Sequence, residues 1–192
     1  MRFKGMRSFA AALFIWLAFA SAAQAAECAD MWQWLDFACR RLADTYQQGH
    51  NDVYLSGYTW HTPWTWTAEK RAEENAKAWG LGVGRSREQA DGDTDLVYAL
   101  VFADSHKNPE WNVGYAWNTY WGPRHGLQVG LGYTAAIVVR TDIAKGWPFP
   151  VVLPLGSVRY DRVSLFGTYI PNVGGGINQG SVFYFFAKIT LD

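Results

Sequence analysis

The sequence predicts an all-β fold, an eight-stranded antiparallel transmembrane β-barrel with a short N-terminal amphipathic helix. Glycine alternates with large apolar residues over residues 79–84, and a similar two-residue rhythm returns over 111–121 and 127–134. Successive side chains of a strand point to opposite faces, so the apolar side chains of each segment share one face. A membrane barrel shows that face to lipid, whereas a soluble barrel turns it inward.

The composition also favours a membrane barrel. Of the 192 residues, 49% are hydrophobic and 17% aromatic. No stretch after residue 25 approaches the roughly 18 continuous apolar residues of a membrane helix. Only helices and closed barrels satisfy every backbone polar group in lipid, so a lipid-facing chain without membrane helices is predicted to be a barrel.

The first 25 residues have the pattern of a secretory signal peptide. Three basic residues precede an apolar run over 9–20, and Ala23-Gln24-Ala25 is a small-x-small cleavage site. We therefore divide the chain into a signal peptide (1–25), an N-terminal segment with the helix (26–50) and the barrel (51–192). Cleavage removes three of the 17 basic residues and none of the 17 acidic ones, which leaves an acidic chain with no sign of nucleic-acid binding.

An amphipathic helix is predicted before the barrel. Apolar side chains recur there at helical spacing, at Met31, Leu35, Ala38, Leu42 and Tyr46. One interpretation is a clamp at the membrane interface, which the tryptophans on the apolar face favour. The other is a cap packed on the barrel mouth.

The two cysteines, Cys28 and Cys39, belong to a chain predicted to be secreted, where a disulfide is the default. Their spacing argues against one. If both lie in one helix, they are about 16 Å apart along its axis, beyond the roughly 7 Å that a disulfide can bridge. They can pair only if the chain before about Asp30 folds back.

Eight candidate strands follow the helix, separated by turn-rich segments such as 91–93, 122–124 and 172–176. The predicted strands cover residues 52–65, 78–87, 95–104, 110–121, 126–139, 148–158, 160–171 and 180–190. An even number of strands about ten residues long is typical of outer-membrane barrels. The alternative is a soluble lipocalin-like barrel, which has the same strand count.

Small residues dominate the face predicted to point inward, at Gly80, Gly82, Gly84, Gly114, Ala116, Gly130, Gly132 and Thr134. The interior of an eight-stranded barrel is just wide enough to be filled by side chains, and these residues cannot fill it. The pattern therefore predicts a narrow cavity suited to an acyl chain. The alternative is that glycine only relieves crowding where strands bend.

Prolines interrupt two neighbouring predicted strands. Pro148, Pro150 and Pro154 lie in the sixth and Pro171 ends the seventh, and none has the N–H that a β-ladder needs. Interrupted pairing between these strands predicts a lateral gate from the lipid into the barrel. Alternatively, Pro148 and Pro150 belong to the preceding loop.

Polar residues suited to catalysis gather at one predicted rim. The first and third strands run in the same direction, so His61 near the end of the first and Asp104 and Ser105 after the third reach the same end. This allows His61 as a base, Asp104 orienting it and Ser105 as nucleophile or polar partner. The alternatives are an ordinary Asp-Ser turn and an interface histidine.

No metal or cofactor is predicted. The four histidines are scattered along the chain, and the cysteines lack zinc-site spacing. No glycine-rich strand leads into a helix, so the glycines do not indicate a phosphate-binding loop.

The chain resembles the PagP-type lipid A palmitoyltransferases of the Gram-negative outer membrane over essentially its whole mature length. Six motifs in the right order carry the resemblance: Tyr58-Thr59-Trp60-His61, Trp79-Gly80-Leu81-Gly82-Val83-Gly84, the segment from Tyr98 to Ser105, Gly114-Tyr115-Ala116-Trp117, the segment from Pro150 to Leu155, and Thr168-Tyr169-Ile170-Pro171.

The resemblance implies an outer-membrane enzyme that moves a palmitoyl chain from the sn-1 position of a phospholipid to lipid A. Its catalytic residues match His61, Asp104 and Ser105, on extracellular loops. We further expect a monomer without a cofactor. The alternatives are a barrel that binds or transports single-chain lipids, which would need the cavity but not His61 or Ser105, and a structural or adhesive barrel with a packed lumen.

Two departures from the family pattern bear on this expectation. Ala116 replaces the glycine at the floor of the family's acyl pocket, which predicts an acyl chain slightly shorter than palmitoyl. Ser56 replaces a proline linked to a second lateral opening, so the resemblance implies a gate only near Pro150 and Pro171.

Overall fold

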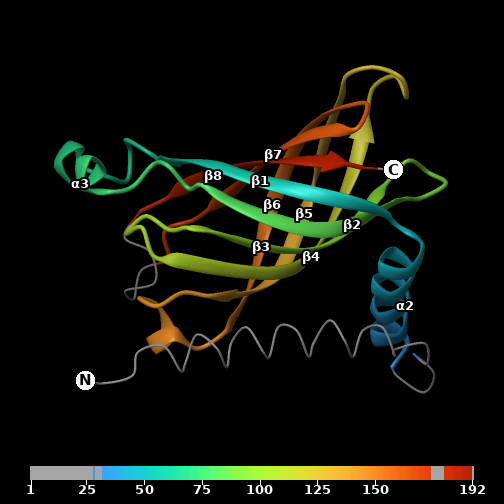
Figure 1. The fold of residues 1–192 in the computed structure, drawn as a ribbon, viewed down its shortest axis with the longest axis horizontal. Helices are drawn as coiled ribbons and strands as arrows, with labels where there is room; N and C mark the ends of the chain where they lie inside the picture. The colour runs from blue at the N-terminus through green and yellow to red at the C-terminus, as the bar shows by residue number, and fades with distance from the viewer. Residues whose placement is uncertain (1–27, 29–31, 174–179, 192) are drawn as a thin grey trace.

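The computed structural model describes residue 28 and residues 32–173 and 180–191. These residues form a closed antiparallel barrel of eight strands, in which each strand pairs with its neighbours in chain order and β8 pairs with β1. Among the described residues, one helix, α2, precedes the barrel (Figure 1). The predicted fold class is therefore confirmed, while the predicted signal peptide lies outside the described residues.

The strands lie close to their predicted positions. Their bounds are β1 His50–His61, β2 Gly80–Glu88, β3 Thr94–Ala103, β4 Pro109–Trp121, β5 Gln128–Val139, β6 Phe149–Tyr160, β7 Val163–Ile170 and β8 Val182–Thr190; the helices are α2 Gln33–Gln48, α3 Ala68–Glu73 and the 3-10 turn η1 Ala144–Gly146. Sequence reasoning missed α3, because six residues are too few to show helical periodicity. None of the helices among the described residues is long and apolar enough to cross a membrane.

Side chains alternate across the barrel wall as predicted. On the outside, Leu81 and Val83 are 62% and 65% exposed. On the inside, Leu96, Leu155 and Phe166 are almost completely buried. The barrel thus has an apolar outer face and an interior that its own side chains fill in part.

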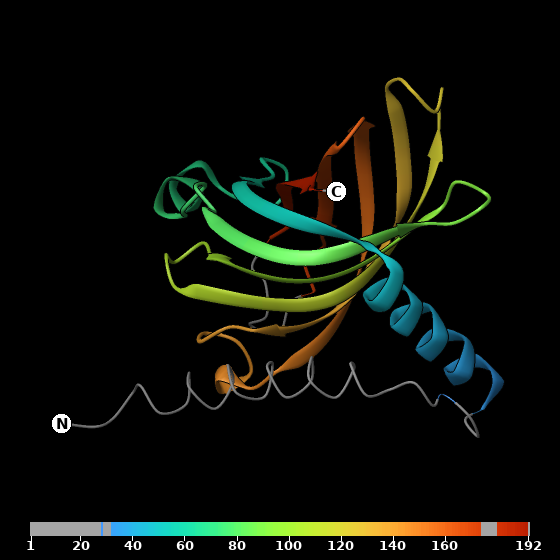
Figure 2. The ribbon, with the colours of Figure 1, turned by 45° about the vertical axis from the view of Figure 1, so that its right-hand side comes forward.

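The two ends of the barrel carry different elements. Figures 1 and 2 show α2 beside one end and α3 at the other. The connections β1–β2, β3–β4, β5–β6 and β7–β8 meet at the second end, which is called here the α3 end. The opposite end, which carries the short connections, is the α2 end.

Helix α2 is attached to the barrel by charged side chains. Arg41 donates to the Asp95 carboxylate, with Nε 3.2 Å from Oδ2, and Arg85 donates to the carbonyls of Tyr46 and Gly49 at the end of the helix. Phe37 is 60% exposed, so apolar surface also faces away from the barrel. The helix therefore packs against the outer side of β2 and β3 near the α2 end, and its contact with a membrane interface stays a prediction.

Cys28 and Cys39 form a disulfide, with Cα atoms 5.9 Å apart. The spacing argued against a disulfide only for the case in which both residues lie in one helix. They do not, because α2 begins at Gln33 and Cys28 lies before it. The helical separation therefore does not apply, and Cys28 lies beside Cys39.

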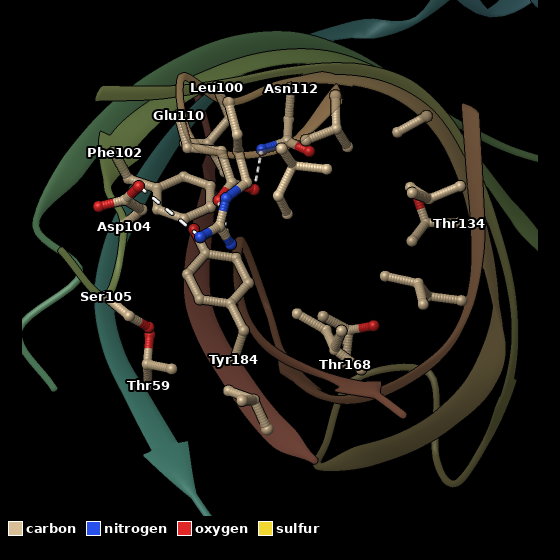
Figure 3. A pocket seen from close by; sticks show the side chains of 18 of the residues that line it. Thr59, Leu100, Phe102, Asp104, Ser105, Glu110, Asn112, Thr134, Thr168 and Tyr184 are labelled. Carbon is tan, nitrogen blue, oxygen red and sulfur yellow. Dashed lines mark hydrogen bonds and ion pairs between the residues drawn. The ribbon is translucent and has the colours of Figure 1, made fainter. Parts of the chain in front are cut away.

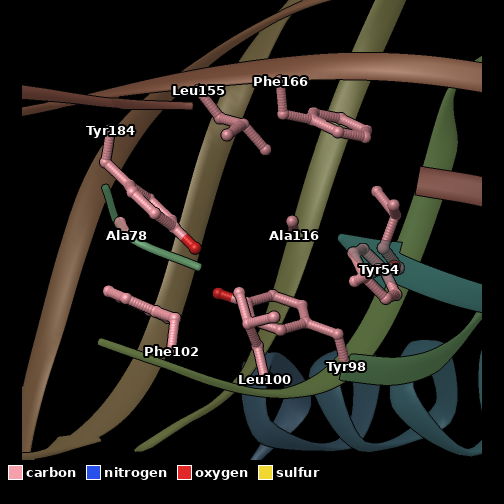
Figure 4. Close-up of a cluster of buried hydrophobic side chains, with 10 residues drawn as sticks. Tyr54, Ala78, Tyr98, Leu100, Phe102, Ala116, Leu155, Phe166 and Tyr184 are labelled. Atoms are coloured by element: carbon pink, nitrogen blue, oxygen red, sulfur yellow. The ribbon is translucent and has the colours of Figure 1, made fainter. Parts of the chain in front are cut away.

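The lumen near the α2 end is polar. The Lys188 ammonium contacts Asp52 Oδ1 at 3.0 Å and Ser86 Oγ at 2.8 Å, and the Asp52 side chain is wholly buried. Above this cluster, Tyr54, Leu96, Leu155 and Phe166 pack into an apolar plug (Figure 4). Open space lies on the other side of the plug, at the α3 end.

Candidate active site

A cavity of about 640 Å³ occupies the lumen at the α3 end. Much of its wall is apolar, with Leu100, Phe102 and Val138 among the lining residues. Polar groups gather at one side of its mouth: Figure 3 shows Asp104 and Ser105 there, with Thr134 and Thr168 across the lumen. The cavity is therefore a largely apolar space with a polar entrance.

The structure brings His61 and Ser105 together. His61 is the last residue of β1 and Ser105 lies in the β3–β4 loop, and the two meet because these strands run in the same direction. The His61 Nε2 atom is 3.0 Å from Ser105 Oγ. His61 is 6% exposed, and its ring meets the edge of Trp66 at 5.1 Å between centroids. A buried imidazole bonded to a hydroxyl is the geometry that proton transfer requires.

Asp104 lies beside this pair and shapes the loop that carries Ser105. Its Oδ1 atom accepts hydrogen bonds from the backbone N–H groups of His106 and Asn108, both at 2.8 Å. This is an Asx-type turn, in which a side-chain oxygen closes the loop. No hydrogen bond among the described residues joins Asp104 to the His61 ring, so the predicted orienting contact is absent from this arrangement.

Asn75, in the segment after α3, ties that segment to the same loop. Its backbone N–H donates to the Ser105 carbonyl at 2.8 Å, and its side-chain Nδ2 donates to the Asp104 carbonyl at 3.2 Å. Sequence reasoning missed Asn75, since a lone asparagine in a loop carries no spacing signal. It fixes the backbone of both predicted site residues.

Arg140, which follows β5, balances the negative charge beside Asp104. Its guanidinium holds Asp142 through bonds of 3.0 and 2.8 Å and lies 3.4 Å from Glu110 and 3.7 Å from the free Oδ2 of Asp104. Burial alone would lower the pKa of Arg140, but the hydrogen bond to Asp142 and the nearby carboxylates raise it above its usual value. Arg140 therefore stays charged and compensates the carboxylate of Asp104.

One cluster at this rim has spacing that suits a metal ion. Asp104, His106 and Asp142 each offer one ligand atom within 4.8 Å of the others. The Arg140 guanidinium is paired with both carboxylates of the cluster, however, and a fixed positive charge there opposes a bound cation. The residues therefore fit a charge-balanced network better than a metal centre.

The small residues predicted to line an acyl pocket point inward but are not among the residues that line the cavity. None of the six, Gly82, Gly84, Gly114, Ala116, Gly130 and Gly132, lines the cavity that the described residues enclose. Large side chains occupy the space beside them: a Cβ placed on Gly84 would lie 2.8 Å from the Tyr54 ring, and one on Gly132 would collide with Asn118. These glycines make room for facing side chains.

Pairing between β6 and β7 is interrupted at the predicted gate. The β6–β7 ladder runs from Leu155 opposite Thr168 toward the α2 end, so Phe149–Pro154 have no ladder partner in β7 among the described residues. Pro150 lies inside β6 and Pro171 directly follows β7, and both line the cavity. Pro150 therefore belongs to the strand, whereas Pro148 lies in the preceding loop. This stretch without ladder pairing between β6 and β7, called here the seam, runs along the cavity wall.

A second ladder also ends early, at the position where serine replaces the family's proline. The β1–β2 ladder stops at Ser56 opposite Gly80, and a bulge between Ser56 and Tyr58 shifts the register with β8. The Ser56 hydroxyl donates to the Ala78 carbonyl and accepts a hydrogen bond from Tyr184 at 2.7 Å. Ser56 thus links β1, β8 and the segment before β2 at the end of the ladder.

Comparison with known proteins identifies the family. The family model for the antimicrobial peptide resistance and lipid A acylation protein PagP matches residues 41–188. A lipid A acyltransferase PagP from Methylobacillus flagellatus is 38% identical over 168 residues, which cover 88% of this chain and 89% of the relative. Proteins of the same name from Bordetella parapertussis and Legionella pneumophila are 37% and 36% identical, over 86% and 83% of this chain and 90% and 85% of their own. The predictions of a PagP-type protein and of an acyltransferase are therefore confirmed, and this chain belongs to the PagP family of lipid A acylation proteins.

Proposed function

We propose that this protein transfers a palmitoyl or slightly shorter chain from the sn-1 position of a phospholipid to lipid A in the Gram-negative outer membrane, as a monomer without a cofactor. The observation that carries the proposal is the His61–Ser105 hydrogen bond of 3.0 Å at the mouth of a largely apolar cavity of about 640 Å³. A catalytic pair at the entrance of an acyl-sized space suits a reaction at the ester end of a bound chain.

The transfer exchanges one ester for another. The acceptor hydroxyl of lipid A attacks the sn-1 carbonyl carbon, the new ester bond forms, and the bond from that carbon to the glycerol oxygen breaks. His61 accepts the proton of the attacking hydroxyl and returns it to the glycerol oxygen, which leaves as a lysophospholipid. The exchange changes neither the net charge of the reactants nor the oxidation state of any atom.

Ser105 and Asp104 support this step in different ways. The Ser105 hydroxyl, bonded to His61, suits either a donor to the negative oxygen of the transition state or a nucleophile that carries the acyl chain briefly. Asp104 acts as a positioning residue through the turn that holds Ser105. Intact mass spectrometry with phospholipid but no lipid A distinguishes the two roles of Ser105, because only the nucleophile gains an acyl mass.

The outer surface supports a membrane location. Exposed aromatic side chains gather toward both ends of the barrel, at Trp60, Trp64, Trp79 and Trp147 near the α3 end and at Trp121 and Tyr160 near the α2 end. Aromatic girdles that flank an apolar band are typical of outer-membrane barrels. In this proposal the α3 end, with the site, faces the cell exterior, and residues 1–25 act as a signal peptide.

The donor chain enters through the seam between β6 and β7 in this proposal. Extending the ladder register past Thr168 places Leu153 opposite Ile170, and both line the cavity. A disulfide engineered between these positions should block transfer until it is reduced. The matched control is a disulfide between Val158 and Leu165, which pair within the intact ladder, and it should leave transfer intact. Full activity of the oxidised Leu153–Ile170 cross-link would rule out this entrance.

The test of the whole proposal is mass spectrometry of lipid A from cells with and without this protein. We expect one additional acyl chain with the native protein and none with His61→Ala or Ser105→Ala, although both variants should fold as heat-resistant barrels. Removing a positioned acid or base typically lowers the rate by about 10²-fold to 10⁴-fold. Unchanged lipid A in cells that make the folded native protein would contradict the proposal.

A further inference from the structure

An apolar groove of about 290 Å³ runs over the outer wall of the barrel, on the neighbouring strands β2, β3 and β4 (Figures 1 and 2). Its outward side chains are all apolar and form two rows of the ladder: Val83, Ala99 and Val113, and then Leu81, Val101 and Trp111. Ala99 forms the floor, because the residues on both sides of it carry larger side chains. Leu81 and Val83 are exposed, so the groove faces outward and not into the lumen.

Helix α2 limits the groove on the side of the α2 end. Val97 is the next outward residue of β3 in that direction, and it is only 8% exposed. Its ladder partner Arg85 donates to the Tyr46 carbonyl of α2 at 2.6 Å. The groove therefore begins where the cover of the helix ends, and it continues toward the α3 end. Val101 is four residues before Ser105, which corresponds to about 10 Å along the barrel axis.

Two exposed lysines lie at the α3 end of the same strands. Lys77 precedes β2, and Lys107 lies in the β3–β4 loop. A backbone hydrogen bond of 2.8 Å from Asn75 to the Ser105 carbonyl joins the two segments, and each lysine is two residues from this bond. Neither ammonium forms an ion pair with another residue that the structure describes. The carboxylates at the cavity mouth are balanced by Arg140 instead.

We propose that this groove and these two lysines bind the acceptor lipid A, with one of its acyl chains in the groove and a phosphate at Lys77 and Lys107; the inference rests on the proposed function. Lipid A joins several acyl chains to a phosphorylated sugar head. An apolar groove that leads to two unpaired ammonium groups complements such a molecule, because lysine binds phosphate as a point charge. A phospholipid with an ethanolamine head has no net charge for the lysines to attract.

The groove and the lumen place the two substrates on opposite sides of one wall. In this proposal the donor chain lies inside the barrel, whereas the acceptor chain lies outside it. A chain in the groove brings its head to the end of β2 and β3, beside the loop that carries Ser105. The wall ends at this rim, so the acceptor hydroxyl meets the donor ester there. Lipid is as apolar as the groove, and selection therefore depends on packing and on the lysine charges.

The first test fills the groove. Native barrel in detergent is mixed with lipid A but no phospholipid, and native mass spectrometry gives the fraction of barrel that carries one lipid. Ala99→Phe should raise the Kd for lipid A about tenfold through lost packing. The control is Ala187→Phe, the same change on the outer face of β8, where Ala187 pairs with the exposed Leu165. It should keep the native Kd.

The second test removes the charges. Lys77→Gln combined with Lys107→Gln should also raise the Kd about tenfold, the combined effect of two exposed ion pairs. Lipid A without its phosphates should bind native protein and this double variant equally. The control is Lys145→Gln in η1, another exposed lysine at the α3 end, which should leave the Kd for lipid A unchanged.

Transfer kinetics connect binding to the reaction. Both changes should raise the KM for lipid A and leave the KM for the phospholipid donor and kcat unchanged. If native protein transfers nothing, the proposed function fails, while the binding measurements still test the groove because they need no catalysis. Heat-dependent gel mobility verifies that each variant is folded.

The inference needs both parts of the surface. A native Kd for lipid A in either the folded Ala99→Phe variant or the folded double lysine variant would overturn it. An equal loss of phosphatidylethanolamine binding in Ala99→Phe would overturn it too, because the groove would then hold any membrane lipid. If Ala99→Phe does not fold, Ala99→Leu replaces it under the same criterion.

Discussion

Replacing Asp104 by asparagine or alanine separates two roles that a carboxylate can have beside a histidine. Asparagine keeps an acceptor oxygen for the backbone N–H groups of His106 and Asn108, whereas alanine removes both bonds. If Asp104 acts mainly by shaping the loop that carries Ser105, asparagine should function far better than alanine. If its charge stabilises a protonated His61, the two variants should be equally poor.

The structure supplies the magnitudes. Each bond from a backbone N–H to a charged acceptor contributes about 1.5 to 3 kcal/mol, so alanine removes about 3 to 6 kcal/mol of loop stabilisation. Asparagine keeps both bonds at neutral strength and loses about 1 kcal/mol in each. The loop also keeps the Asp104 N–H bond to the Asn108 carbonyl at 2.8 Å and both contacts from Asn75. We therefore expect transfer to fall by at most about thirtyfold for asparagine and by about 10²-fold or more for alanine.

The assay is transfer of labelled palmitoyl from a defined phosphatidylcholine to lipid A by barrels purified in detergent. Heat-dependent gel mobility verifies folding, and His61→Ala gives the background rate. Equal loss in folded Asp104→Asn and Asp104→Ala would refute the positioning role and restore the charge of Asp104 as the essential feature.

Three further changes test the rest of the structure. Asp52→Ala leaves the buried Lys188 ammonium without its carboxylate and should lower the free energy of unfolding by about 3 to 5 kcal/mol. Urea titration of the barrel in lipid vesicles measures this loss, and an unchanged free energy of unfolding would contradict the buried ion pair. Asp142→Asn tests the ion pair with Arg140. Burial acts to raise the pKa of Asp142, but the hydrogen bond from Arg140 outweighs it and lowers that pKa below its usual value. The ion pair therefore stabilises the fold at pH values above about 4, the pKa of aspartate in the unfolded chain, and this stabilisation is lost as the pH falls through the lower pKa of Asp142 in the folded protein. The variant should be less stable than the native protein at pH 7 and equally stable in strong acid. Asn75→Ala should reduce transfer about tenfold or more without changing the acyl-length profile, and a rate equal to that of the exposed-site control Glu73→Ala would remove Asn75 from the site.

Alternation and strand direction made much of the barrel predictable. A period of two identifies which residues share a face, and antiparallel order places His61 and Ser105 at the same end before any contact is known. The prolines likewise indicated where the β6–β7 ladder stops, because proline lacks the N–H that pairing requires. These inferences need only local geometry.

Other features depend on contacts that local geometry does not encode. The disulfide depended on where α2 begins, since the distance between Cys28 and Cys39 follows from whether both are helical. The turn that Asp104 closes depends on two backbone N–H groups that face its side chain only once the loop has folded. Asn75 could not be found because its partners lie in another loop.

The glycines show that a pattern can give the direction of a side chain without giving the space around it. A small side chain that points inward can leave a void or admit a larger neighbour, and the register decides which. Gly82 lies opposite Leu100 and Gly84 opposite Tyr98, so the small residues of β2 face large ones on β3. On β4, Gly114 likewise admits the Tyr98 phenol. The cavity opens instead at the end of the barrel where β6 lacks its β7 partner, because there the wall itself is incomplete.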